Sequence, residues 1–175
     1  MPQPSNRFLG KFRGRVVDNN DPQRRGRIRA EVTDVLGREP SSWALPCLPF
    51  TAEHAGHYNV PQPGAGVWIE FEQGDPSFPI WSGCWYGTGD ELPPDAVAAQ
   101  QATPPSHPVV IQTPAGSKLV LEDTPGGGIL LQAGGASVRI DGGGVHVEDG
   151  SGGTLTLANG ALDVNNGGLT VPRKQ

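Results

Sequence analysis

The chain has 175 residues, including 26 Gly and 18 Pro, and its formal net charge at pH 7 is −5. This density of helix breakers excludes a helical bundle, because inside a helix each Gly costs about 1 kcal/mol and each Pro about 3 kcal/mol. The acidic balance argues against a protein whose main task is binding nucleic acid, since phosphate contacts need a basic surface. Four Trp and a regular apolar alternation in the second half argue against disorder. We therefore expect an all-β chain.

Composition divides the chain into segments. All aromatic residues lie between Phe8 and Tyr86, and none follows. A stretch rich in Pro, Ala and Gln comes next, which we expect to be extended and stiff because Pro fixes φ. The expected segments are an N-terminal arm at 1–10, a first domain at 11–90, a linker at 91–108, a Gly-rich second domain at 109–171 and a tip at 172–175.

The chain shows no targeting or membrane segment. No stretch approaches the roughly 18 apolar residues that span a bilayer, and no apolar signal-peptide core lies near the start. We therefore expect Cys47 and Cys84 to be free, buried thiols rather than a disulfide.

The first domain is predicted to consist of short strands. Residues 26–32 alternate, with Ile28, Ala30 and Val32 on one face, as a half-buried strand does. Turn residues such as Asp and Pro separate the apolar segments. Five short strands with one long excursion between the third and the fourth predict a five-stranded barrel of the OB type. The predicted strands span residues 12–18, 26–32, 43–48, 67–71 and 79–85.

The second domain carries a repeat. Apolar-x-apolar triplets are separated by Gly-rich turns and start 10, 10, 9, 7, 10, 7 and 7 residues apart. Period 2 within each triplet indicates a short strand with one apolar face, and the repetition predicts a β-solenoid or β-helix. The triplets are Val109/Ile111, Leu119/Leu121, Ile129/Leu131, Val138/Ile140, Val145/Val147, Leu155/Leu157, Leu162/Val164 and Leu169/Val171.

A single chain of this pattern would bury little apolar surface, because its length suffices for only about three coils. If three chains share one axis, their apolar side chains form one core and neighbouring chains cover the strand edges. We therefore expect an intertwined trimeric β-helix rather than a flexible Gly-rich tail. Its expected core is Leu119, Leu121, Ile129, Leu131, Val138, Ile140, Val145, Val147, Leu155, Leu157, Leu162, Val164, Leu169 and Val171.

The first domain resembles a known family. Its motifs are similar to those of the OB domain shared by phage baseplate assembly protein V, the T4-type tail spike protein and the Vgr proteins of type VI secretion systems. The Gly-rich repeat resembles the trimeric β-helix spike that follows this domain in the family. The residues that carry the OB resemblance are Gly14, Asp21, Pro22, Gly26, Pro63, Gly64, Gly74, Asp75, Pro76 and Gly83.

The resemblance implies a structural central spike of a contractile tail or contractile injection system baseplate. Such a spike is a rigid homotrimer that attaches to a baseplate hub protein at its OB end and pierces the target envelope. The resemblance also implies assembly in the bacterial cytoplasm and a place in the virion tail baseplate or injection particle. We expect no cofactor and no bound nucleic acid.

The C-terminal end departs from the family's phage spikes, which often carry a His-x-His pair that binds iron at the apex. Residues 169–175 contain no His, so we expect no metal there. The trimer would end in a blunt apolar layer, and the resemblance implies that a PAAR-type tip protein docks on it. The expected docking residues are Leu169, Val171, Pro172 and Arg173.

The sequence contains no catalytic constellation, so we expect a protein that is not an enzyme. His54 and His57, beside Glu53, make a weak metal pattern, and two solvated or hydrogen-bonded His are the expected explanation. Asp34 and Asp75 are a conceivable carboxylate pair for glycoside cleavage. Asp75 within Gly-Asp-Pro is better explained as a turn residue.

Two alternative functions stay open. An OB fold can bind single-stranded nucleic acid through aromatic side chains in a basic groove, and the basic run at residues 24–29 supports this alternative. No Lys or Arg lies between residues 39 and 117, however, so we expect Trp43, Trp68 and Trp81 in the core. The second alternative is a trimeric receptor- or sugar-binding fibre, which would show an exposed aromatic cluster beyond the repeat.

Overall fold

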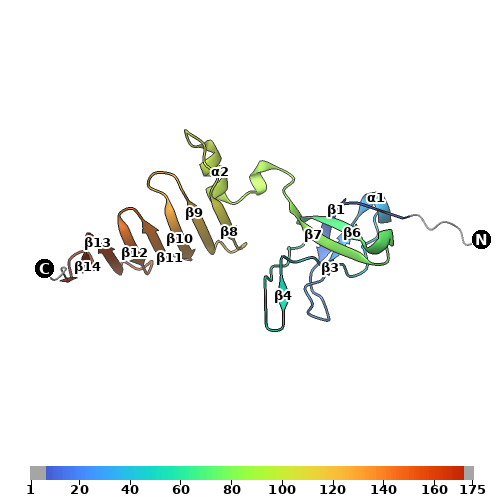
Figure 1. The fold of residues 1–175 in the computed structure, drawn as a ribbon, viewed down its shortest axis with the longest axis horizontal. Coiled ribbons are helices and arrows are strands. Elements are labelled where there is room, and N and C mark those ends of the chain that lie inside the picture. The colour runs from blue at the N-terminus through green and yellow to red at the C-terminus, as the bar shows by residue number, and fades with distance from the viewer. Residues whose placement is uncertain (1–6, 172–175) are drawn as a thin grey trace, which may run out of the picture. The chain divides into compact units, whose positions relative to one another are not determined.

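The computed structural model describes residues 7–171 and divides into two compact units, Met1–Thr88 and Gly89–Gln175 (Figure 1). Strands dominate both units, as the composition predicts. Among the described residues, no helix is long and apolar enough to cross a membrane.

The N-terminal unit is built on a five-stranded sheet with the order β2-β1-β6-β7-β3. Neighbouring strands are antiparallel except β3 and β7, which are parallel. Hydrogen bonds from Ile28 N to Ala44 O (3.2 Å) and from Ala44 N to Ile28 O (2.8 Å) join the segments at the two sheet edges. All five predicted strands are therefore present. They are β1 (Phe12–Asp18), β2 (Arg29–Glu31), β3 (Leu45–Pro46), β6 (Gly66–Phe71) and β7 (Pro79–Trp85).

Smaller elements complete this unit. The one-turn helix α1 (Thr33–Leu36) follows β2, and the 3-10 turn η1 (Glu72–Gly74) joins β6 to β7. The long excursion between β3 and β6 contains a two-stranded hairpin of β4 (Thr51–Ala52) and β5 (Ala55–Gly56).

The core of the N-terminal unit comes from alternate positions on these strands and from residues that directly flank them. Trp81 is buried there and donates its indole N–H to the carbonyl oxygen of Gly26 at 3.1 Å. Trp43 and Trp68 are only partly buried, so the prediction of a core position was wrong for both. The core cluster consists of Val16, Ile28, Ala30, Val32, Ala44, Val67, Ile69, Phe71 and Trp81.

The two cysteines differ from their predicted environment. Cys47 and Cys84 are free, as expected, but both are exposed rather than buried. Cys47 directly follows the edge strand β3, and Cys84 lies near the end of β7, and neither contributes to the core cluster.

The segment expected to be an extended linker is partly helical. It contains the 3-10 turn η2 (Gly89–Glu91) and the helix α2 (Pro94–Gln101). Pro94 is tolerated because it lies in the first turn, where its missing N–H has no helical partner. The ion pair between Lys118 Nζ and Asp95 Oδ2 (2.8 Å) fixes α2 to the sheet that follows.

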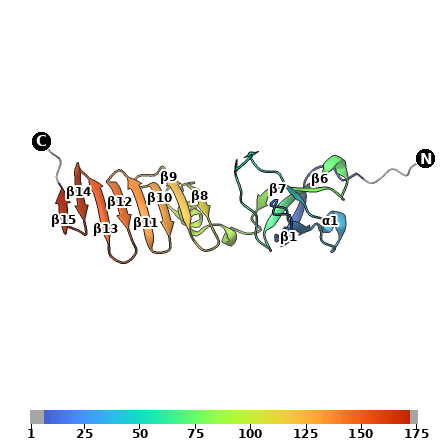
Figure 2. The same ribbon diagram turned by 90° about the horizontal axis from the view of Figure 1, so that it is seen from below.

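The C-terminal unit is one eight-stranded antiparallel sheet in which the strands follow in sequence order from β8 to β15 (Figures 1 and 2). Each of the inner strands, β9 to β14, pairs with the strands before and after it in the chain. The strands are β8 (Val109–Gln112), β9 (Lys118–Glu122), β10 (Gly128–Ala133), β11 (Ala136–Asp141), β12 (Gly144–Glu148), β13 (Thr154–Ala158), β14 (Ala161–Val164) and β15 (Leu169–Val171).

The turns of this sheet explain why the strands of one chain form an antiparallel meander; the trimeric β-helix that the repeat predicts is not shown. Asn159 and Gly160 join β13 to β14 with φ values of 52° and 76°. Two consecutive residues with positive φ make a type I′ hairpin turn, which reverses the chain into an antiparallel strand. A coil of a single-chain β-helix would need the chain to advance in one direction, and this chain reverses instead.

Candidate functional site

The strand register of the C-terminal sheet gathers the repeat's apolar residues on one face. Residues opposite each other in an antiparallel pair point to the same side of the sheet. The apolar residues of all eight strands therefore fall into two continuous rows, which we call the apolar face. One row is Val109, Leu121, Ile129, Ile140, Val145, Leu157, Leu162 and, by backbone register, Val171; the other is Ile111, Leu119, Leu131, Val138, Val147, Leu155, Val164 and Leu169.

The apolar face lies open in the single chain. Ile111 is 63 % exposed, Leu131 50 % and Leu169 59 %, and no segment of the unit within the described residues covers them. Soluble monomers rarely leave so continuous an apolar surface in water, and such a surface marks an interaction site. The apolar face is therefore the candidate functional site of this unit.

The opposite face of the same sheet, which we call the polar face, carries the charged residues. Among the strand residues that the structure describes, every Lys, Arg, His, Asp and Glu of β8–β15 occupies it and none occupies the apolar face. These residues are Lys118, Glu122, Arg139, Asp141, His146, Glu148 and Asp163.

Ion pairs and hydrogen bonds organise the polar face. Arg139 Nε lies 2.6 Å from Asp141 Oδ2, and the N–H of Gly143 donates to Asp141 Oδ1 at 2.7 Å. The Arg139 guanidinium, followed by this N–H, holds the pKa of Asp141 below its usual value. His146 stands next to both, with Nε2 at 3.8 Å from Asp141 Oδ1. The network keeps this face solvated and ordered.

Helix α2 also belongs to the polar face. Asp95 binds Lys118 there, and Ser106 Oγ, just after the helix, donates to Glu122 Oε2 at 3.1 Å. Val120 lies between Lys118 and Glu122 on this face and is only 9 % exposed. Helix α2 thus leaves the apolar face open.

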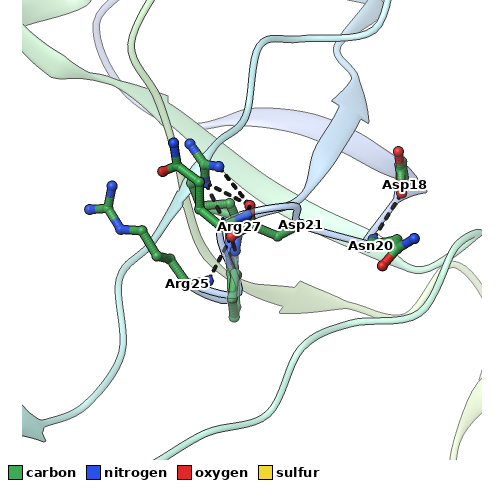
Figure 3. Close-up of polar contacts among 8 residues, drawn as sticks. Asp18, Asn20, Asp21, Arg25 and Arg27 are labelled. Atoms are coloured by element: carbon green, nitrogen blue, oxygen red, sulfur yellow. Dashed lines mark hydrogen bonds and ion pairs between the residues drawn. The ribbon is translucent and has the colours of Figure 1, made fainter.

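A buried ion pair organises the first turn of the N-terminal unit (Figure 3). Asp21 accepts hydrogen bonds from Arg27 Nη2 (2.6 Å) and from the backbone N–H groups of Gln23 (2.9 Å) and Arg25 (2.7 Å). The Arg27 side chain, with these N–H groups, lowers the pKa of Asp21 far below its usual value. Arg27 also lies over the Trp43 ring, 5.6 Å from its centroid. This arginine of the basic run is therefore structural.

The structure also reveals a cation–aromatic cluster that the sequence pattern did not indicate. The guanidinium of Arg13 lies 5.9 Å from the centroid of the Trp68 ring and 5.3 Å from that of Trp85. No local sequence pattern marks the cluster, because its arginine comes from β1 and its tryptophans from β6 and β7, far apart in sequence. The pairing of β1 with β6 and of β6 with β7 brings the three side chains together.

Several motif glycines occupy positions that only glycine adopts readily. Gly26, Gly64, Gly74 and Gly83 have positive φ values of 74°, 91°, 81° and 121°. Gly14 has an ordinary φ, but a Cβ there would lie 2.9 Å from Ile69 Cγ1 in the core. These positions shape turns and close strand contacts, which is a structural role.

The other motif residues lie in turns. Asp75 accepts a hydrogen bond from the N–H of Ser77 at 2.9 Å, as a turn residue does. The prolines Pro22, Pro63 and Pro76 all lie outside strands and helices. Together the motif residues therefore define loops, and they do not converge on a chemical site.

The remaining predicted positions are scattered. Asp34 is exposed in α1, and the side chains of Glu53 and His54 are 91 % and 92 % exposed. Among the residues that the structure describes, no group of three or more His, Cys, Asp or Glu is placed to hold a metal ion. Of the predicted tip residues, Pro172 and Arg173 lie outside the described residues, and Leu169 ends one row of the apolar face.

Comparison with known protein families agrees with this two-part organisation. Residues 12–86 match the type VI secretion system/phage-baseplate injector OB domain. Residues 108–170 match the phage baseplate V C-terminal trimerisation domain, and this range covers the apolar face up to its last strand. Among curated proteins, none matches the chain. The two family matches together take in most of the sequence, and the chain therefore belongs to the baseplate V-type proteins of phage and type VI secretion baseplates.

Proposed function

We propose that this protein is the central spike of a contractile tail or injection system baseplate, a rigid homotrimer that pierces the target envelope. The observation that carries the proposal is the apolar face, which is continuous over eight strands and is not covered by the described residues of its own chain. It coincides with the region that matches a trimerisation domain.

Trimer formation follows from the energetics of the apolar face. Burying a large aliphatic side chain stabilises a protein by about 1.5–3 kcal/mol. Side chains near half exposure, such as Leu131 at 50 % and Leu157 at 50 %, therefore gain about 1 kcal/mol each when two other copies cover them. Summed over two rows in three chains, this gain outweighs the usual cost of association.

The polar face supports the same arrangement. When the apolar faces of three copies meet on one axis, the charged residues and α2 point outward. The resulting surface is solvated, and the core contains no ionisable strand residue among those described. A mechanical role requires such a uniform apolar core, because a buried unpaired charge would weaken every layer.

The OB-type unit has the second role in the proposed function, which is attachment. It attaches the trimer to the baseplate hub protein, and a PAAR-type protein completes the distal end beyond Leu169. The described residues supply turns, strands and a structural ion pair, and we therefore propose a protein without enzymatic activity or cofactor.

Cryo-electron microscopy of the assembled particle tests this function. We expect threefold density for this chain on the axis of the baseplate, directly under the tube, with the N-terminal unit toward the hub. Location at the periphery of the baseplate, or in an assembly without a contractile tube, would contradict the proposal. Release of soluble fragments from peptidoglycan or polysaccharide by the purified trimer would contradict the absence of enzymatic activity.

A further inference from the structure

We propose that the N-terminal unit binds a carboxylate of a partner protein in a hollow beside the Arg13–Trp68–Trp85 cluster. The partner supplies an aspartate or glutamate side chain from an exposed segment of a second baseplate protein. The proposal goes beyond the proposed function, because it depends on neither the trimer nor the piercing role. The hollow, which we call the arginine hollow, has a volume of about 190 Å³ and is lined by Arg13, Gly14, Arg15, Glu31, Thr33 and Trp85.

The arginine hollow lies on the outer surface of the N-terminal sheet. Alternate residues of β1 are buried in the core, and Arg13 and Arg15 point outward from the same strand and are exposed. Arg13 is the register partner of Trp68 on β6, and Arg15 is the register partner of Glu31 on β2. A ligand can therefore reach both guanidinium groups from the solvent.

The tryptophan beside the hollow is held in one orientation. The indole N–H of Trp85 donates to the carbonyl oxygen of Val67 at 3.2 Å. Its ring packs on Gly66, where a Cβ would lie 2.7 Å from Cδ2 and Cε2. The Arg13 guanidinium lies 5.3 Å from the centroid of this ring. A side chain that is ordered beforehand loses little freedom on binding, and Trp and Arg are the residue types that dominate the energetics of protein interfaces.

The charges of the hollow favour an anion. Lys11, on the same surface, already pairs with Glu70 at 3.1 Å. In contrast, neither Arg13 nor Arg15 forms an ion pair with a carboxylate of the described residues. The hollow contains these two guanidinium groups and the carboxylate of Glu31, which leaves one net positive charge.

The shape of the donors fits a carboxylate. A guanidinium has five N–H groups in a planar fork that matches the two oxygens of a carboxylate. Arg15 donates through Nη1 to the carbonyl oxygen of Gly64 at 2.6 Å, and this contact fixes its direction while leaving other donors of the fork. Thr33 adds a hydroxyl group to the lining of the hollow. One acidic side chain can thus be held by directed hydrogen bonds as well as by charge.

A protein fits the hollow better than a nucleic acid or a sugar. A nucleic-acid backbone needs a series of cations along a groove, and here two arginines stand beside a glutamate. Stacking of a base or a sugar on Trp85 would compete with Arg13, which lies over this ring, and with the backbone of Gly66. A carboxylate requires no open ring. The family match to a baseplate injector domain supports a protein as its source.

Peptide binding to the full-length protein tests the proposal. The probe is acetyl-Gly-Glu-Phe-amide, whose glutamate supplies the carboxylate and whose phenylalanine supplies an apolar neighbour. The indole N–H signals of the isotope-labelled protein are followed by nuclear magnetic resonance and assigned with Trp68→Phe and Trp85→Phe. We expect a saturable shift of the Trp85 signal, while the signal of Trp81 in the core stays in place. The same peptide with glutamine in place of glutamate should bind at least about tenfold more weakly.

Three charge variants make the test specific. Arg13→Gln should weaken binding of the acidic peptide at least about tenfold, because it removes a charged donor. Lys11→Gln is the matched control on the same surface and should leave the affinity unchanged, since Lys11 is already paired. Glu31→Gln removes a like charge from the hollow and should strengthen binding by about two- to fivefold. Damage to the fold would not produce such an increase.

Four results would overturn the proposal. They are the lack of a saturable shift, equal binding of the glutamine peptide, unchanged binding by Arg13→Gln, and tighter binding of a thymidine oligonucleotide or of galacturonic acid than of the acidic peptide. If Arg13→Gln does not give the far-ultraviolet circular dichroism of the parent, Arg15→Gln replaces it with the same expected loss. Light scattering on the same samples separates this proposal from the proposed function. A trimeric parent that does not bind the peptide overturns the arginine hollow alone.

Discussion

The sharpest perturbation of the trimer is a single charge on the apolar face, and Leu131→Asp provides it. Leu131 lies in the middle of one row, opposite Leu119 and Val138, and is 50 % exposed in its own chain. In the trimer, three copies of this position converge near one axis. The adjacent residue, Gln132, points to the polar face and gives the matched control Gln132→Asp.

The magnitude follows from burial and charge. Each chain loses about 1 kcal/mol of stabilisation from the remaining exposed half of the leucine side chain. Each chain also brings a carboxylate into an apolar core at a cost of several kcal/mol. For three chains the loss is on the order of 10 kcal/mol, or about seven orders of magnitude in the association constant. A trimer that is stable at micromolar concentration should disappear.

Size-exclusion chromatography with light scattering measures the result. We expect a trimer for the parent protein and for Gln132→Asp, and a monomer or an aggregate for Leu131→Asp. The reasoning would be refuted if Leu131→Asp remained trimeric at micromolar concentration. Equal dissociation of both variants would also refute it, because the effect would then not depend on the face of the sheet.

Three further predictions concern the stability of each unit. Arg27 and nearby N–H groups lower the pKa of Asp21. The ion pair therefore contributes fully to the free energy of unfolding above the ordinary Asp pKa of about 3.9. This contribution is lost as the pH falls below that value. When the pH is lowered below 4, the melting temperature of the parent should therefore decrease more steeply than that of Asp21→Asn. Parallel curves of melting temperature against pH for the two proteins would argue against a stabilising ion pair. Gly66→Ala places a Cβ 2.7 Å from the Trp85 ring and should lower the free energy of unfolding, measured in urea, by about 2 kcal/mol. An unchanged free energy of unfolding would contradict this prediction. Gly144 has a φ of 139°, and a Cβ there would collide with the carbonyl oxygen of Leu157 on β13. Gly144→Ala should therefore raise the amide hydrogen exchange rates of β12 and β13. Unchanged exchange rates would contradict the pairing register of these two strands.

Much of the N-terminal unit could be predicted from the sequence because turn residues and alternation mark its strands. β1 and β7 have the bounds that the sequence predicts. β2 is shorter because Ile28 leaves the ladder and pairs with Ala44 across the sheet edges. That pairing joins segments distant in sequence, and no local pattern specifies it. The ion pair of Arg27 with Asp21 could not be predicted either. Four arginines lie within six residues at 24–29, and nothing in the local sequence indicates which of them binds Asp21.

Helix α2 had a local signal that composition obscured. Pro and Ala dominate the segment, and a Pro-rich segment is typically extended. The order of residues matters more than their number: Pro94 and Asp95 stand at the start, where a fixed φ and a negative charge favour a helix, and alanines follow. The ion pair of Asp95 with Lys118 then supplies the tertiary contact that a short helix requires.

The C-terminal unit shows which part of a repeat determines which part of the structure. Period 2 within each triplet specifies the face of the sheet, and this period alone suffices to assign the apolar residues to one side. The direction of the next strand depends instead on the turn. Offsets of 7 residues leave room for a five-residue strand and a two-residue turn, and Asn159-Gly160 is the sequence that such a reversing turn prefers. Hairpins therefore follow from the spacing, whereas a β-helix would need turns that keep the chain advancing.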